Sequence, residues 1–266
     1  MRGMGQVVTV TIGLIVLLVA FALINPNFWS PTNRTNLLRQ IAPILIIGIA
    51  QSYVLITGNI DLSIGSVVGM STMVAATLMS KGIMSPIPAL LVTLLCCLLI
   101  GVLNGLLVAK FKLPPFIATL GTMTVARGIA QLVNGNYNTD SIMKFYPEAA
   151  QTFKNVFYYG KTLGLYNGIW IAIILWIVFN FLLSKTRTGR YIYATGSNID
   201  AARLSGVNVV STTVIAYVVS AFCSFVVGII TCATVGQGTM DAGNSYEMYA
   251  VAASVIGGVS TLGGQG

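Results

Sequence analysis

The sequence GNIDLSIGS, residues 58–66, lies between two apolar stretches of membrane-spanning length. The flanking stretches, Ile41–Ile60 and Leu62–Ser80, each approach the ~20 mostly apolar residues that a transmembrane helix needs. Because almost no polar residues separate them, the chain must turn sharply at or within the membrane. Gly58 and Gly65 permit the tight backbone paths that such a turn requires. The sequence therefore predicts a membrane-embedded turn between two helices.

The turn also carries an ionisable residue, Asp61. Asp61 or Ser63 can cap the following helix by accepting hydrogen bonds from its free N–H groups. Alternatively, Asp61 has a transport role, because non-helical backbone and charge at membrane depth are tolerated only inside protein or a water-filled cavity. Both interpretations stay open. The candidates for a pathway or a helix break are Gly58, Asn59, Asp61, Ser63, Gly65 and Ser66.

The composition extends this membrane interpretation to the whole chain. Of the 266 residues, 56% are hydrophobic and 8% are charged, whereas a soluble domain is about 25% charged. The net charge of +8 indicates Lys and Arg in loops at the membrane face rather than nucleic-acid binding. The lack of histidine excludes Ser–His and Cys–His nucleophiles and His-ligated zinc. The cysteines lie in apolar runs and are interpreted as packing residues: Cys96, Cys97, Cys223 and Cys232.

The apolar stretches predict an all-α polytopic membrane protein with about eight transmembrane helices. The first is expected to be an uncleaved span, because it is long for a signal peptide and no small-x-small cleavage site follows it. The stretches are Val7–Ile24, Ile41–Ile60, Leu62–Ser80, Ile87–Ala109, Phe116–Val133, Gly168–Ser184, Ser211–Cys232 and the beginning of an eighth at Met248–Leu262.

The distribution of Lys and Arg predicts a cytoplasmic N-terminus. Lys110, Lys112 and the cationic cluster at 185–203 then face the cytoplasm, and the polar segment 134–167 faces outward. Scattered cations fall on the outer side in the same scheme: Arg34, Arg39 and Lys81.

A second polar segment, TRTGRYIYATGSNIDAARLSGVNV at residues 186–209, is called the 186–209 segment below. Asn198 or Ser197 can cap a short helix here, with Asp200 in its first turn and Gly206 at its end. An amphipathic helix with Arg203 exposed is suited to docking a soluble partner. The alternative is a solvated, positive anchor without a partner.

The sequence VIGGVSTLGGQG, residues 255–266, is rich in glycine, but no Lys follows the glycines, so it is not a phosphate-binding P-loop. Close helix packing or a broken span fits it better. Arg127 lies inside a span and is expected to reach an interface or to pair with a carboxylate. Glu247 precedes the last apolar stretch, where the helix dipole stabilises it.

These three motifs together resemble a known family. GNIDLSIGS resembles the (S/G)GIDLSVGS signature of the ribose/galactose/xylose-type ATP-binding-cassette (ABC) importer permeases. The 186–209 segment resembles their cytoplasmic coupling segment, and residues 255–266 resemble their VIGG motif. The matches run in order from about residue 25 to 266. Asn59 departs from the family pattern, which usually has Gly there.

The resemblance implies a type II ABC-importer-like permease of about ten helices in the bacterial cytoplasmic (inner) membrane. Residues 1–266 would be a single transmembrane permease domain, C-terminally incomplete. The chain would import a monosaccharide, ribose being favoured, by alternating access, and would hold no cofactor. Its partners would be an ATP-binding subunit that holds ATP and Mg, an extracytoplasmic sugar-binding protein, a second permease chain and membrane lipid. The residues implied in coupling to the ATPase are Asn198, Ala201, Ala202, Arg203, Leu204, Ser205 and Gly206.

Other functions are weaker alternatives. A secondary transporter or channel for a small polar solute would need an ion-coupling group, and Asp61 is the only convincing candidate. An ABC permease for a nucleoside or a branched-chain amino acid shares the general fold. An intramembrane enzyme is disfavoured, because histidine is absent, acidic residues are few and no paired nucleophile is evident.

Overall fold

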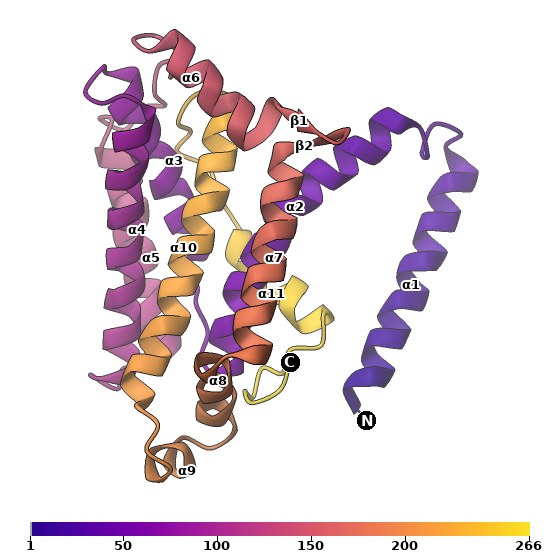
Figure 1. Ribbon diagram of the computed structural model, residues 1–266, viewed down its shortest axis with the longest axis vertical. Coiled ribbons are helices and arrows are strands. Elements are labelled where there is room, and N and C mark those ends of the chain that lie inside the picture. The colour runs from indigo at the N-terminus through magenta and orange to yellow at the C-terminus, as the bar shows by residue number, and fades with distance from the viewer. Residues whose placement is uncertain (1) are drawn as a thin grey trace.

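The computed structural model describes the backbone of residues 2–266 and the side chains of residues 8–266, and it is mostly helical (Figure 1). Among the described residues, four helices are long and apolar enough to cross a membrane: α2 (Pro31–Ile56), α4 (Pro86–Ala109), α7 (Asn167–Lys185) and α10 (Val209–Val235). They are accompanied by α1 (Arg2–Ile24), α3 (Ile64–Ser80), α5 (Pro115–Leu132) and α11 (Tyr246–Ile256).

The short elements lie at the two ends of the bundle (Figure 1). One end carries α6 (Pro147–Lys154), the π-helix η1 (Asn155–Tyr159) and a small antiparallel hairpin of β1 (Lys161–Thr162) and β2 (Leu165–Tyr166). The other end carries α8 (Arg187–Ser197) and α9 (Ile199–Leu204), and the beginning of α1 and the C-terminal residues lie toward it. The helix α1 stands apart from the other helices, with its main contact at α11.

Helix α10 forms the centre of the bundle and packs against α4, α2 and α3. Glycines bring the backbones together: a Cβ on Gly101 of α4 would lie 2.7 Å from the carbonyl oxygen of Tyr217, and one on Gly228 would lie 2.5 Å from the Cβ of Ser71. Helices in a membrane associate through such close packing, because lipid tails remove most of the hydrophobic drive between them.

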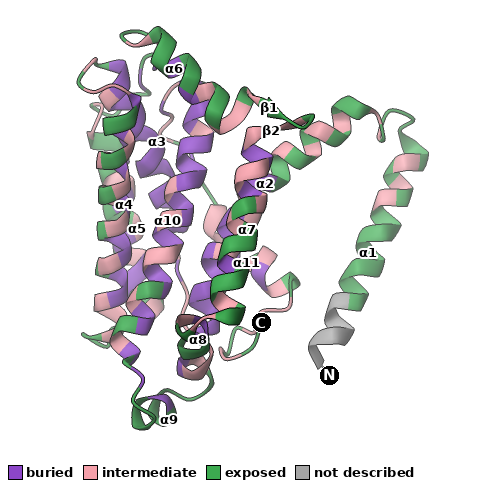
Figure 2. Cartoon of the chain, viewed as in Figure 1, coloured by how far each residue is buried: buried purple, intermediate pink, exposed green. Residues whose placement is uncertain are grey.

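The outer surface is apolar, as a bilayer requires. A stripe of leucines four residues apart runs along α4, and Leu95 and Leu99 are 63% and 65% exposed. Buried residues instead concentrate in α3 and α10 (Figure 2). Because large exposed apolar surface is rare on soluble proteins, the arrangement confirms the predicted membrane-embedded, polytopic protein.

Two short helices, α3 and α11, begin inside the bundle, each after a non-helical segment that follows a long helix. After α2, Gly58 (φ +78°) turns the chain into a non-helical segment that ends where α3 begins. After α10, Gly236 (φ +79°) does the same before α11. The N-terminal ends of α3 and α11 meet at Gly65, where a side-chain Cβ would collide with the carbonyl oxygen of Gly243.

The two broken spans are related by an inversion of the chain direction. Helix α2 contacts α11 in the way that α10 contacts α3. At ~1.5 Å per residue, the 17 residues of α3 and the 11 residues of α11 have a combined length of about 42 Å, close to the ~40 Å of the single helix α10. Each therefore covers only part of the membrane thickness, and the positive ends of both helix dipoles face the middle.

Some predicted boundaries are wrong. The eighth predicted span, Met248–Leu262, is helical only as far as Ile256, because the glycines that follow adopt turns, with positive φ at Gly258, Gly263 and Gly264. Helix α2 begins ten residues before Ile41, because Pro31 stands in its first turn and the side chain of Ser30 caps it. The polar segment 134–167, for which no secondary structure was predicted, contains α6, η1 and the hairpin after a non-helical part up to residue 146.

Candidate functional site

The 58–66 turn is held by a buried carboxylate. Asp61 is 2% exposed. Its Oδ1 accepts from the backbone N of Ser63 at 2.9 Å and from Ser63 Oγ at 2.6 Å, and its Oδ2 accepts from Ser220 Oγ of α10 at 2.7 Å. The hydroxyl of Tyr217 donates to the carbonyl of Ile60 at 3.0 Å. The centre of the turn is thus fixed to α10 through two consecutive residues, Ile60 and Asp61.

The hydrogen bonds continue across the bundle. Asn104 of α4 donates from Nδ2 to Ser63 Oγ at 2.9 Å, and Thr122 of α5 donates to Asn104 Oδ1 at 2.6 Å. Asp61, Ser63, Asn104 and Thr122 are all buried. In a low-dielectric interior such bonds are strong, and an unpaired partner is costly. The network therefore joins α4, α5 and α10 at the beginning of α3.

The capping prediction for this turn is wrong. Neither Asp61 nor Ser63 accepts from the first-turn N–H groups of α3, because Asp61 is engaged by the N–H of Ser63, which lies just before the helix. Of the predicted pathway residues, Gly58 is exposed and Asn59 is half-buried, with its Nδ2 donating to Thr57 Oγ1 at 2.8 Å. The remaining candidates are buried: Asp61, Ser63, Gly65 and Ser66.

The 186–209 segment contains the predicted capped helix. Asn198 Oδ1 accepts from the backbone N of Asp200 at 3.0 Å and of Ala201 at 2.9 Å, and α9 ends just before Gly206, which has φ +83°. The preceding helix α8, where Thr186 Oγ1 accepts from the backbone N of Gly189, was not predicted. That cap resembles the one at Asn198 and could have been found in the same way.

Helix α9 has one buried side and one exposed side. Ala202 is buried against Val207 and Val209. Leu204 is 90% exposed, and Arg203 is exposed beside Asp200, with Nη1 3.4 Å from Oδ1. The other predicted coupling residues, Asn198, Ala201, Ser205 and Gly206, are exposed as well.

Helix α8 connects this surface to the transmembrane core. Gly196 packs so closely on the carbonyl of Ile56, the last residue of α2, that no side chain fits between them. Gly264 N donates to the same carbonyl at 2.8 Å, and Tyr193 donates to the carbonyl of Gly266 at 2.8 Å. A cavity of about 740 Å³ separates the 58–59 turn from Arg203. The glycine-rich residues 255–266 therefore serve in close packing, one of their two predicted roles.

The partners of Arg127 were not predicted from the sequence. Its Nη1 donates to the carbonyls of Met240 at 2.8 Å and Ala242 at 3.0 Å, in the non-helical segment between α10 and α11. The signal was a charged residue in an apolar span, but its partners lie more than a hundred residues away. They are backbone carbonyls, whereas an interface or a carboxylate were the two alternatives expected from the sequence.

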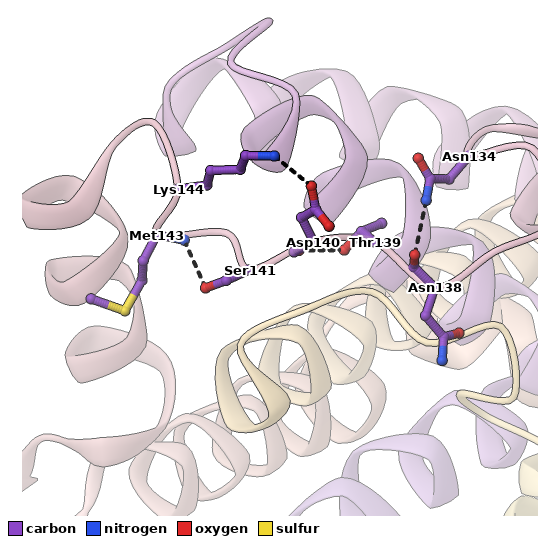
Figure 3. Close-up of polar contacts among 7 residues, drawn as sticks. All are labelled: Asn134, Asn138, Thr139, Asp140, Ser141, Met143 and Lys144. Atoms are coloured by element: carbon purple, nitrogen blue, oxygen red, sulfur yellow. Dashed lines mark hydrogen bonds and ion pairs between the residues drawn. The ribbon is translucent and has the colours of Figure 1, made fainter.

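The non-helical segment between α10 and α11 begins at the end of the bundle that carries α6, where the loop after α5 contacts it. The loop after α5 is ordered by its own contacts, among them Asn134 with the carbonyl of Asn138 and Lys144 with Asp140 at 2.7 Å (Figure 3). It also binds the segment after α10: Thr139 Oγ1 accepts from Gly238 N at 2.8 Å. The Lys144 ammonium holds the pKa of the Asp140 carboxyl below its ordinary value.

Known proteins resemble this chain over nearly its whole length. Residues 33–265 match the family described as branched-chain amino acid transport system / permease component. The ribose import permease protein RbsC of Haemophilus influenzae is 40% identical over 96% of this chain and 77% of its own length. RbsC of Escherichia coli K12 is 34% identical over 96% and 78%, and the galactofuranose transporter permease protein YtfT of the same strain is 36% identical over 99% and 76%. No solved structure matches.

The match and the fold agree. The chain is membrane-embedded, its matched residues include both broken spans and the 186–209 segment, and its relatives are permease components, which are transport subunits rather than enzymes. The chain therefore belongs to the family of transport-system permease components.

Proposed function

We propose that this chain is the transmembrane permease subunit of an ATP-driven ABC importer for a monosaccharide, with ribose as the favoured substrate. The observation that carries the proposal is the 40% identity to a ribose import permease over 96% of the chain. The 31–36% identities to galactofuranose and D-allose permeases support a sugar as the substrate class.

We assign the two proposed soluble partners to the two ends of the bundle. An ATP-binding subunit, which holds ATP and Mg, docks on the 186–209 segment through the exposed side of α9. Asn198, Ala201, Arg203, Leu204, Ser205 and Gly206 form that surface, and Ala202 supports it from within. The beginning of α1 lies toward the same end (Figure 1), which supports the proposal of a cytoplasmic N-terminus. The α6 and hairpin end then faces the extracytoplasmic sugar-binding protein.

The hairpin is suited to this docking because it is anchored to a membrane helix. The guanidinium of Arg39 in α2 lies 3.3 Å from the ring centroid of Tyr166 and 4.7 Å from that of Tyr158. Cation–π contacts of this kind are worth about 0.5–2 kcal/mol. A force on the hairpin therefore reaches α2 directly.

The mechanism is alternating access in a type II permease that pairs with a second permease chain. Closure of the ATPase dimer pushes on α9 and α8, and the close contact of Gly196 with Ile56 passes this motion to α2. The 58–66 turn, from Gly58 to Ser66, is the bend at which α3 separates from α2. Rocking of packed helices around such breaks opens the pathway to one side at a time.

The test is reconstitution in vesicles with the ATP-binding and sugar-binding subunits. We expect the ATPase to copurify with the chain, and we expect uptake of labelled ribose that needs ATP, stops with vanadate and survives an ionophore. Uptake that survives vanadate and collapses with the ionophore would instead identify a secondary transporter.

A further inference from the structure

The segment between α10 and α11 places polar side chains deep in the membrane. Helix α11 has 11 residues and is therefore about 16 Å long. Its last turns pack beside α2, since Ser254 Oγ donates to the carbonyl of Gly48 at 2.9 Å, and the chain after α11 then reaches the end of α2, where Gly264 N donates to the carbonyl of Ile56 at 2.8 Å. The beginning of α11 is thus about one helix length, or about half of the ~30 Å hydrocarbon thickness, farther from the end of α2. The contact of Gly243 with Gly65, the second residue of α3, supports the same depth.

Residues at this depth are polar and accessible. Asp241, Asn244 and Ser245 are exposed, and Glu247 is half-buried in the first turn of α11. Tyr249 is 52% exposed. The lipid-facing side of α4 exposes leucines at comparable distances from its ends. Carboxylate and amide groups avoid hydrocarbon and face protein or a water-filled cavity.

The surroundings hold this segment in one conformation. Arg127 fixes the carbonyls of Met240 and Ala242, which immediately flank Asp241. Glu247 lies against Gly65, so its charge is close to the N-terminal ends of both α3 and α11, where helix dipoles favour an anion. Ser245 has a strained φ of +63°, a conformation that persists where surrounding structure enforces it.

We infer that residues 241–249 form the wall of the pathway that contacts the transported sugar. This inference rests on the proposed function and deepens it by naming the site. The site offers what a neutral polyhydroxylated ring requires. Asp241, Glu247 and Asn244 supply hydrogen-bond acceptors and donors for hydroxyl groups. Tyr246 and Tyr249, with ring centroids 6.1 Å apart, supply aromatic faces for the C–H side of the ring.

The arrangement is suited to transient contact with a sugar that moves along the pathway rather than to tight binding in an enclosed site. The polar groups lie on one exposed wall rather than enclosing the sugar, so contacts form and break as the ring moves. The fixed backbone at Met240 and Ala242 keeps that wall in place. The pathway residues of this chain are therefore those after α10, whereas Asp61 is engaged by Ser63 and Ser220 inside the protein.

The inference is tested by thiol labelling in vesicles that contain the chain with its ATP-binding and sugar-binding subunits. Asn244→Cys and Tyr249→Cys are compared with Leu95→Cys on the lipid side of α4, all in a Cys96→Ala background, because the other native cysteines are buried. The probe is a charged, membrane-impermeant methanethiosulfonate. Because it reacts with the hydrated thiolate, we expect the two pathway positions to react at least about tenfold faster than Leu95→Cys.

Millimolar ribose is expected to slow the reaction at Asn244→Cys severalfold and to leave Leu95→Cys unchanged. Rates equal to that of Leu95→Cys, or rates that ribose does not affect, would overturn the inference. The proposed function is tested by a separate assay, ATP-driven ribose uptake in vesicles that contain the unmodified chain. Uptake without labelling thus rejects the pathway assignment alone.

Discussion

Replacing Gly65 by alanine tests the contact between the two broken spans. Its Cβ would collide with the carbonyl oxygen of Gly243 and lie 2.5 Å from Glu247 Oε2. Ordinary contact distances are about 3.5–4.0 Å, so the non-helical backbone must move by about 1 Å or more. Overpacking of this kind costs about 1–3 kcal/mol. Alanine recovers about 0.5–1 kcal/mol of helix propensity, which leaves a net loss of up to about 2.5 kcal/mol.

The matched control is Gly121→Ala in α5, where a Cβ would meet nothing within 4 Å. This variant has the propensity gain alone and is expected to be more stable by about 0.5–1 kcal/mol. The assay is thermal unfolding in detergent with a thiol-reactive fluorescent dye, since Cys97, Cys223 and Cys232 are buried until the fold opens. A Gly65→Ala protein as stable as Gly121→Ala would refute the proposed contact.

Three further predictions follow from other contacts. Ser220→Ala leaves Asp61 Oδ2 without its 2.7 Å donor and is expected to lower the free energy of unfolding by about 1.5–3 kcal/mol in the same melting assay. The control, Thr124→Ala on the exposed side of α5, should change this free energy little. Equal effects of the two substitutions would contradict the role of the buried hydrogen-bond network. Arg127→Leu leaves the carbonyls of Met240 and Ala242 without their side-chain donor. We expect ribose uptake in vesicles to fall in this variant and to be partly retained in Arg127→Lys. Wild-type uptake by the leucine variant would show that the contact of Arg127 with these carbonyls is not needed for transport. Arg203→Glu reverses the charge on the exposed side of α9, and Gly206→Pro is incompatible with φ +83°. In both variants we expect ATP hydrolysis to continue without ribose uptake while the protein still inserts into the membrane. Normal coupling of hydrolysis to uptake in both variants would show that the 186–209 segment has no part in the mechanism.

The sequence predicts those parts of the fold that depend on local patterns. The long apolar stretches correspond to helices, and the cap at Asn198 and the end at Gly206 mark α9, because caps and hydrophobic runs act within a few residues. The predicted turn after α2 also exists, since Gly58 takes the left-handed conformation that its position requires.

The position of α11 inside the bundle could not be predicted from the sequence. The helix ends at Ile256, within the glycine-rich residues 255–266 for which a broken span was one of the two interpretations, but no local pattern marks the non-helical segment between α10 and α11. Its position depends on contacts with distant residues, such as Gly65 and Arg127. Nor does the sequence show that Asp61 is engaged by Ser220, because no local pattern connects residues 159 positions apart.

The central claim is that an ATPase drives this chain from the α9 end, and a site-specific photocross-link tests it most directly. Leu204 is 90% exposed on α9, and Leu163 is 86% exposed on the hairpin at the opposite end. Each is replaced by cysteine in the Cys96→Ala background and carries a benzophenone maleimide in the complete complex. We expect a cross-link from position 204 to the ATP-binding subunit, with loss of ATP-driven ribose uptake, and none to that subunit from position 163. A cross-link to the ATP-binding subunit from position 163 alone would contradict it.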